Sequence, residues 1–198
     1  FDNLPSTAFA LTNLDDKNGM VMLQNTKAKK KTYSLRTDAD FKGMVMESYF
    51  DGMELKINNN TLFTFLVGKF NASNLQAIYG TAILLGMSEE EKLKEITKLH
   101  SAPGRFQMIQ SESGVVGIVD YAHTPDALKN VLDTINEIRT HNELLITVAG
   151  AGGDRDASKR PEMSEVAVTR SDKLILTSDN PRFEDADDII RQMKDGVP

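Results

Sequence analysis

The sequence predicts an α/β protein built from two successive regions. Up to about residue 66, short apolar runs alternate with turns containing Asn and Gly, a pattern typical of antiparallel strands and hairpins. From Asn71 the apolar period becomes that of a helix, and beyond residue 103 short apolar strands alternate with amphipathic helices. We therefore expect a mixed sheet of antiparallel strands with helices, followed by a parallel sheet with crossover helices.

Five apolar runs mark the strands expected in the first region. They are residues 19–24, 31–36, 43–50, 51–57 and 61–67. The period-two alternation within these runs predicts strands with one face buried.

Two helices are expected to close the first region. The first begins near Asn71 and ends at Gly86, which can adopt the left-handed conformation common after a helix. Its expected buried face consists of Leu75, Ile78, Ala82 and Leu85. Ser88 and Glu91 have the spacing of a capping box and predict the start of the second helix. The Pro-Gly pair that follows is the predicted domain boundary, which gives domains of residues 1–102 and 103–198.

The second region alternates strand and helix three times. Its expected strands are 115–119, 144–148 and 173–177, and its expected helices begin at Pro125, near Pro161 and near Ala186. The helix from Pro125 is expected to bury Leu128, Val131, Leu132, Ile135 and Ile138. Ligands of parallel sheets bind where loops leave the carboxyl ends of the strands, so the loops after these strands are the candidate site.

Composition restricts the classes of function. The chain of 198 residues carries a net charge of -6, which argues against nucleic acid as a partner. Its apolar runs are too short for membrane insertion, and the lack of cysteine excludes disulfides and thiolate metal sites and suits a cytoplasmic protein. The chain begins without Met and both of its ends look like cuts, so we expect a fragment of a longer protein.

The loop after the first strand of the second region is DYAHTPDAL. Thr124 and Pro125 are explained by helix capping alone. Capping does not explain Asp120, Tyr121 and His123. The acid can hold a ribose hydroxyl or a metal-bound water and the rings can lie beside a base or phosphate, although His123 has a local structural role as an equal alternative.

The loop after the second strand is GAGGDRDASKRP. Its glycines indicate a backbone brought close to another group, but Arg155 stands where a dinucleotide-binding G-x-G-x-x-G motif needs its last glycine. Asp154 and Asp156 flank that arginine. A ligand site and a solvated charged loop both remain open here.

The loop after the third strand contains Asp179, Asn180, Pro181 and Arg182. Capping and turn formation explain part of this run. The planar donor fork of Arg182 matches a carboxylate through two hydrogen bonds, and with Asp179 and Asn180 the turn can accept from an ammonium, through the aspartate, and donate to a carboxylate, through the amide. Together with Arg155, this set suits a zwitterionic amino acid.

Three residues outside these loops are weaker candidates. Asn71 and Asn74 stand at a helix start, where capping explains one of the two. Arg105, after the Pro-Gly pair, can reach a phosphate or simply be solvated.

Five stretches of the sequence resemble the Mur ligase family, the ATP-dependent amide-forming enzymes of peptidoglycan precursor synthesis. They are FNASNLQAIYGTAILLG, GRFQMI, VDYAHTPDAL, GAGGDRDASKRPEM and TSDNPRFED, in the order and spacing of the family, over roughly residues 65–195. The resemblance implies the later part of a central ATPase domain followed by a Rossmann-like C-terminal domain with a parallel sheet.

The resemblance also implies a reaction and its ligands. ATP, with Mg²⁺, would phosphorylate the carboxylate of a UDP-linked muramoyl dipeptide, UDP-N-acetylmuramoyl-L-alanyl-D-glutamate, and the amine of meso-diaminopimelate would attack the acyl phosphate. The expected diaminopimelate-binding residues are Arg155, Asp179, Asn180, Pro181 and Arg182. The expected nucleotide-binding residues are Asn71, Asn74, Arg105, Asp120, Tyr121 and His123, with Asp120 holding the ribose or the nearby hinge.

Parts of the family pattern are missing from this chain. The phosphate-binding loop, the modified lysine that helps to hold magnesium and the sugar-nucleotide-binding domain are expected before Phe1, and further strands and helices after Pro198. We therefore expect no metal ligand and no certain catalytic residue here, and an inactive fragment. The alternatives are a folylpolyglutamate-synthase-like ligase, which should lack the DNPR stretch, and a non-catalytic Rossmann-like binding module. Nothing in the sequence indicates an oligomeric state.

Overall fold

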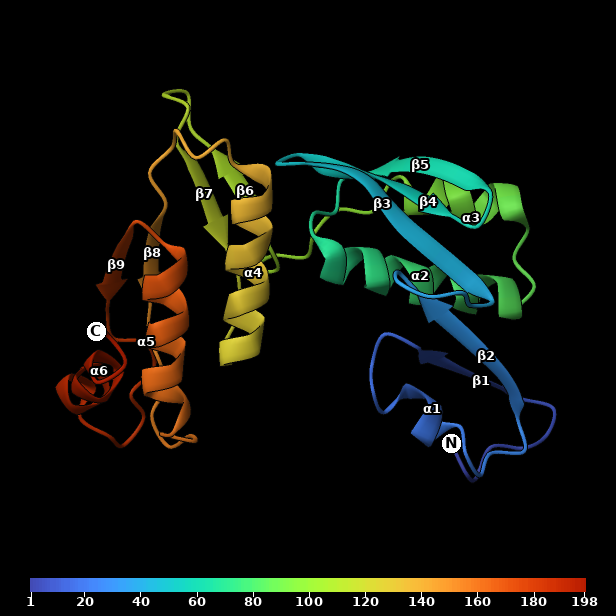
Figure 1. The fold of residues 1–198 in the computed structure, drawn as a ribbon, viewed down its shortest axis with the longest axis horizontal. Helices are drawn as coiled ribbons and strands as arrows, with labels where there is room; N and C mark the ends of the chain where they lie inside the picture. The colour runs from blue at the N-terminus through green and yellow to red at the C-terminus, as the bar shows by residue number, and fades with distance from the viewer. The chain divides into compact units, whose positions relative to one another are not determined.

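The computed structural model describes residues 1–198, which form two compact units (Figure 1). Unit 1 consists of Phe1–Pro103 and Gln107–Gly117, and unit 2 of Gly104–Phe106 and Ile118–Pro198. An α/β protein was predicted, and the strands and helices of both units confirm it. No helix combines the length and the apolar character that a membrane span requires.

A five-stranded sheet forms the centre of unit 1. Its strands, in spatial as well as sequence order, are β1 (Phe9–Asn13), β2 (Lys29–Ser34), β3 (Phe41–Tyr49), β4 (Gly52–Ile57) and β5 (Asn60–Thr64). β3, β4 and β5 are antiparallel, as predicted, but β1 pairs with β2 and β2 with β3 in parallel. A mixed sheet was predicted and is present, but the run 31–36, which overlaps β2, was expected to be antiparallel and is parallel to both of its neighbours. Period-two alternation is common to both kinds of strand, so it did not distinguish them.

The run 19–24 was expected to be a strand and is instead the start of a crossover. It contains the short helix α1 (Gly19–Met22), which lies between β1 and β2 in the chain. Parallel neighbours need such a connection, because the chain must return to the same end of the sheet. A Cβ on Gly19 would lie 2.0 Å from the carbonyl oxygen of Asn13, so this turn approaches the end of β1 more closely than any other residue type permits.

Two helices complete the core of unit 1. They are α2 (Lys69–Leu84), which packs against β1, β2 and β3, and α3 (Glu89–Ile96). The predicted capping box is confirmed, because the Ser88 side chain accepts from the Glu91 amide and the Glu91 side chain accepts from the Ser88 amide. Gly86 is left-handed, as expected, with φ of 87°.

The buried face of α2 differs from the expected one. Ile78 and Leu85 are 47% and 81% exposed, and the buried residues of the helix are Ala72, Leu75, Gln76, Tyr79 and Gly80. The Gln76 amide donates to the carbonyl oxygens of Ser34 and Phe41, so a polar residue occupies the centre of the buried face. The predicted buried face was wrong in part because it was based on apolar residues alone, whereas the face that contacts the sheet includes the polar Gln76.

A two-stranded pair follows, formed by β6 (Gln107–Gln110) and β7 (Val116–Val119). The run 115–119 was expected to join a parallel sheet, but β7 pairs with β6 instead. The turn between them is held by hydrogen bonds from the Ser111 amide to the Val115 carbonyl and from the Gly114 amide to the Ser111 carbonyl. This local pairing closes only a short loop and so has a small entropic cost.

Unit 2 contains two parallel strands and three helices. They are α4 (Pro125–Ile138), β8 (Ile146–Ala149), α5 (Lys159–Arg170), β9 (Lys173–Leu176) and α6 (Ala186–Lys194). The strands pair in parallel from Ile146 opposite Lys173 to Ala149 opposite Leu176, and α5 lies between α4 and α6 (Figure 1). Thr124 caps α4 as predicted, since its side chain accepts from the Ala127 amide.

Candidate functional site

Two loops of unit 2 leave the carboxyl ends of β8 and β9, and they are two of the three loops that the sequence singled out. The pairing of the strands continues into them, because the Thr177 amide donates to the Ala149 carbonyl at 3.0 Å. We call residues 150–158 the β8 loop and residues 177–185 the β9 loop. Since the strands are parallel and adjacent, both loops start at the same edge of the sheet (Figure 1).

The two loops are joined through the backbone. The Gly153 amide donates to the Asn180 carbonyl at 2.9 Å, and a guanidinium nitrogen of Arg182 donates to the Gly153 carbonyl at 2.6 Å. A Cβ on Gly153 would lie 1.8 Å from the carbonyl oxygen of Pro181. The glycines were predicted to bring the backbone close to another group, and at Gly153 that group is the β9 loop.

Each loop contains one non-glycine residue in the left-handed region. Asp154 and Arg182 both have φ of 51°, a conformation that typically costs about 1–3 kcal/mol in such residues. The Arg182 amide donates to the side-chain oxygen of Asn180 at 3.3 Å, and the Phe183 amide donates to the Asp154 carboxylate at 3.3 Å. These bonds hold both residues in the strained conformation.

The guanidinium of Arg182 is anchored but not neutralised. One Nη1–H is used by the Gly153 carbonyl, and the rest of its five N–H donors make no hydrogen bond and no ion pair. The Arg155 side chain is exposed and makes neither kind of contact. Two uncompensated cations therefore stand on adjoining loops.

The rest of the predicted amino-acid site lies in the same turn. Asp179, Asn180 and Pro181 directly precede Arg182, and the side chains of Asp179 and Asn180 are exposed. The Asn180 oxygen already accepts from the Arg182 amide, which leaves the Asn180 NH₂ group as a donor. The structure thus brings four of the five predicted residues into one turn and places Arg155 on the loop bonded to that turn.

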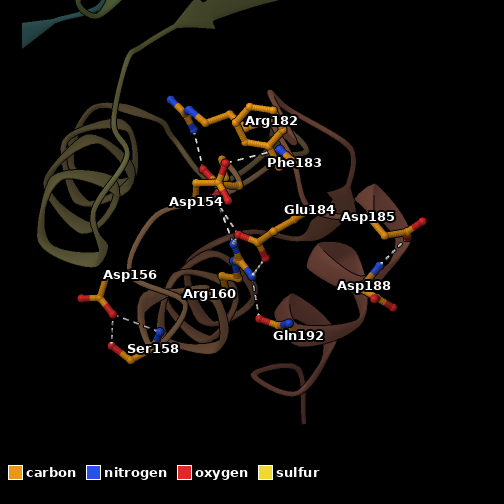
Figure 2. A network of polar contacts seen from close by, with 12 residues as sticks. Asp154, Asp156, Ser158, Arg160, Arg182, Phe183, Glu184, Asp185, Asp188 and Gln192 are labelled. Carbon is orange, nitrogen blue, oxygen red and sulfur yellow. Dashed lines mark hydrogen bonds and ion pairs between the residues drawn. The ribbon is translucent and has the colours of Figure 1, made fainter.

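A buried polar network beside these loops was not predicted from the sequence. Arg160 binds the Glu184 carboxylate through both terminal nitrogens at 2.8 Å, and it also donates to the Gln192 side chain at 2.7 Å and to the Gly152 carbonyl at 3.2 Å (Figure 2). One feature of the sequence is consistent with this network. Arg160 lies in the first turn of α5, where a cation opposes the helix dipole, so a nearby anionic partner is favoured.

Glu184 is strongly acidic in this network. The Arg160 guanidinium and the Asp154 amide lower the pKa of the Glu184 carboxyl to about 2 from its ordinary 4.5. Its carboxylate form therefore stabilises the folded state fully above pH 4.5, and this contribution is lost as the pH falls toward 2.

That linkage gives a measurable pH dependence. We expect Glu184→Gln to lower the thermal unfolding temperature clearly at pH 6 and less at pH 3, because below pH 4.5 the unfolded wild-type protein binds a proton at Glu184 that the folded protein does not, which reduces the contribution of the carboxylate to stability. Circular dichroism at both pH values measures the difference. An equal decrease at pH 6 and pH 3 would contradict the linkage.

Four of the predicted nucleotide-binding residues form a second cluster in unit 2. The Arg105 guanidinium lies 5.0 Å from the centre of the Tyr121 ring, whose own centre is 5.1 Å from that of the His123 ring. The Asp120 carboxylate accepts from the Phe106 amide at 2.7 Å, and the Tyr121 amide donates to the Gly104 carbonyl at 2.8 Å. The cluster therefore also joins the 104–106 segment to the start of the loop before α4.

The other two predicted nucleotide-binding residues lie in unit 1, on the first turns of α2. The Asn71 side chain donates to the Val67 carbonyl at 2.9 Å, which gives it a local role at the helix start. The Asn74 side chain is exposed and makes no hydrogen bond. In residues 1–198 no group of three or more His, Asp or Glu side chains is arranged to hold a metal ion.

Two domain models of one protein family match most of the chain. Residues 1–82 match the Mur ligase middle domain, and residues 104–198 match the Mur ligase glutamate ligase domain. The chain belongs to the Mur ligase family. The predicted family is thereby confirmed.

The similar proteins are longer than this chain. It is 58% identical over 197 residues to UDP-N-acetylmuramoyl-L-alanyl-D-glutamate–2,6-diaminopimelate ligase of Parabacteroides distasonis, covering 100% of this chain and 40% of that Mur ligase. A solved structure of a ligase of the same name has 36% identity and a TM-score of 0.59 over 96% of this chain and 41% of the other. MurF from Acinetobacter baumannii, at 16% identity, shares the fold with a TM-score of 0.76 over 98% of this chain and 41% of its own. The chain thus spans about two fifths of the proteins that it matches.

Proposed function

We propose that the whole protein is an ATP-dependent ligase of peptidoglycan precursor synthesis. It joins meso-diaminopimelate to UDP-N-acetylmuramoyl-L-alanyl-D-glutamate through an acyl phosphate. The observation that carries this proposal is that two of the three arginines around the β8 and β9 loops have no anionic partner. Arg160 is neutralised by Glu184, whereas Arg155 and Arg182 have no anionic partner and are available to an anionic ligand.

The chemistry of meso-diaminopimelate fits these two loops. The free edge of the anchored Arg182 guanidinium offers a carboxylate two parallel hydrogen bonds, and Arg155 offers a second cation. Asp179 accepts from an ammonium, while the Asn180 NH₂ group donates to a carboxylate. L-lysine lacks the second carboxylate, so it would leave Arg182 without a partner in the bound state.

ATP fits the cluster of Arg105, Tyr121 and His123. An arginine stacked on an aromatic ring, next to a second ring, offers a cation to a phosphate and flat surfaces to a base. The bond from the Phe106 amide to Asp120 supports a role for Asp120 in the hinge. Asn71 and Asn74 remain proposed nucleotide contacts from unit 1.

When bound, ATP supplies the phosphoryl group that activates the acceptor carboxylate, and the residues described here position the ligands. Arg155 and Arg182 orient the amino acid so that its amine can attack. The loss of translational and rotational entropy then occurs on binding, before the chemical step, which lowers the barrier of that step. Residues 1–198 contain no group of three or more His, Asp or Glu side chains that could hold Mg²⁺.

Other predictions about the whole protein stay proposals. We place the domain division at residues 102 and 103, and we propose a cytoplasmic location without membrane insertion. The net charge of -6 supports the absence of a nucleic-acid partner. We expect residues 1–198 alone to be inactive.

Phosphate release by the full-length protein tests the proposed function. With ATP and the UDP-linked dipeptide, meso-diaminopimelate is expected to stimulate release with a kcat/KM at least about 100-fold above that of L-lysine, because an unpaired charged donor is costly in a site built for it. Equal stimulation by both amino acids would remove the assigned specificity. Release with glutamate and a folate acceptor would favour the folylpolyglutamate-synthase-like alternative, and no release with any amino acid would favour the non-catalytic binding module.

A further inference from the structure

Arg160 is a buried cation that cannot itself bind the substrate. Only 2% of its side chain is exposed, and its terminal nitrogens are used by Glu184, Gln192 and the Gly152 carbonyl. Its Nε is buried without a hydrogen-bond partner. A guanidinium in this state has no donor left that a ligand can reach.

The partners of Arg160 come from separate segments of unit 2. Arg160 lies in α5, Gln192 in α6, Glu184 in the β9 loop and Gly152 in the β8 loop. A buried charge is destabilising unless it is fully paired, so this guanidinium fixes the distances among the four segments.

Glu184 also holds a second backbone group of the β8 loop, the amide of Asp154. Its Oε1 accepts both from Arg160, at 2.8 Å, and from the Asp154 amide, at 2.5 Å. The Gly152 carbonyl and the Asp154 amide are therefore both held by this ion pair. They flank Gly153, whose carbonyl oxygen anchors the Arg182 guanidinium.

We propose that Arg160 and Glu184 are positioning residues that set the orientation of Arg182 by holding the Gly153 carbonyl between two fixed backbone groups. This inference rests on the proposed function, because it takes Arg182 to be a contact of the amino acid. It assigns to Arg160 and Glu184 no contact with substrate or nucleotide.

Other ion pairs of unit 2 provide the comparison. Arg139 binds Asp172, with side chains that are 10% and 41% exposed, and it also donates to the Glu143 carbonyl. This pair joins the end of α4 to the start of β9 and holds no atom of the β8 or β9 loop. It therefore contributes to the fold of unit 2 as Arg160 does, without the proposed positioning role.

The experiment measures steady-state kinetics of the full-length protein and its variants Glu184→Gln and Arg160→Lys. Glu184→Gln turns an N–H donor toward the guanidinium, and Arg160→Lys cannot bridge Glu184, Gln192 and Gly152 together. Each variant is expected to raise the KM for meso-diaminopimelate at least about tenfold, since one misplaced contact can cost about 100-fold. The KM values for ATP and for the UDP-linked dipeptide should change less than about threefold.

The control variants are Arg139→Lys and Asp172→Asn, which are expected to leave all three KM values within about threefold of wild type. Assays are run at a temperature at which circular dichroism shows each variant folded. A small unfolded fraction would lower the apparent kcat but would not change a KM. If Arg160→Lys does not fold, Glu184→Gln decides, because it retains the length and shape of the wild-type side chain.

The outcomes separate this inference from the proposed function. If the wild type uses meso-diaminopimelate and the Glu184→Gln KM for it is unchanged, or rises no more than the KM for ATP, the positioning role is overturned and the proposed function stands. If the wild type uses another amino acid, the positioning role is tested by comparing the Glu184→Gln change in the KM for that amino acid with the change in the KM for ATP. If it uses none, both proposals fall.

Discussion

Replacing Arg182 by alanine in the full-length protein is expected to raise the KM for meso-diaminopimelate at least about 30-fold. Truncating one partner of a buried charge pair typically costs about 2–5 kcal/mol, which corresponds to roughly 30-fold to 4,000-fold in affinity. The KM for ATP should change less than about threefold, because the nucleotide is assigned to other residues. Phosphate release with each substrate varied in turn measures both values.

Two further variants sharpen that measurement. Arg182→Lys is expected to restore little, since an ammonium cannot both donate to the Gly153 carbonyl and present a planar fork to a carboxylate. Arg191→Ala is the matched control: Arg191 is an arginine of α6 that is 72% exposed and pairs with Asp188. A KM for meso-diaminopimelate that rises equally in Arg182→Ala and Arg191→Ala would refute the assignment of Arg182.

Replacing Gly153 by alanine is expected to cause the second large effect. The added Cβ would stand 1.8 Å from the Pro181 carbonyl oxygen, well inside van der Waals contact, so the β8 and β9 loops must separate. Overpacking against a backbone atom typically costs about 1–3 kcal/mol, and we expect a decrease of about 2 kcal/mol or more in the free energy of unfolding. The separation should also break the bond between Arg182 and Gly153, which raises the KM for meso-diaminopimelate.

Gly117→Ala is the control for this substitution. A Cβ at Gly117, an exposed position of β7, would meet only the Ile109 carbonyl oxygen at 3.7 Å, an ordinary contact. Denaturant unfolding should therefore give nearly wild-type stability for Gly117→Ala and a clear loss for Gly153→Ala. Similar stability of the two variants would mean that the loops separate at no cost.

Features that depend on a few neighbouring residues were predictable from the sequence. The Ser88–Glu91 capping box, the Thr124 cap and the left-handed Gly86 are all present, because each is decided within one turn of the chain. The two adjoining charged loops were also predictable, since the rule that ligands bind at the carboxyl ends of parallel strands depends only on the order of elements.

Features that depend on distant partners were not predictable in this way. The parallel pairing of β1 with β2 has the same alternation as an antiparallel pairing. The central position of Gln76 in the buried face of α2 depends on carbonyl oxygens more than 30 residues away in the chain. Arg160 and its charged neighbour Lys159 both lie in the first turn of α5, so the unfavourable helix dipole applies to both, and the packing of α5 against α6 and the β9 loop decides which of them is buried.

The near-contact of Gly153 with Pro181 has a consequence for protein engineering. Because the two chain segments touch backbone to backbone, we expect that replacing only one of them by the corresponding segment of a related protein would disrupt this contact. A chimera would therefore have to transplant both segments together, as a single module.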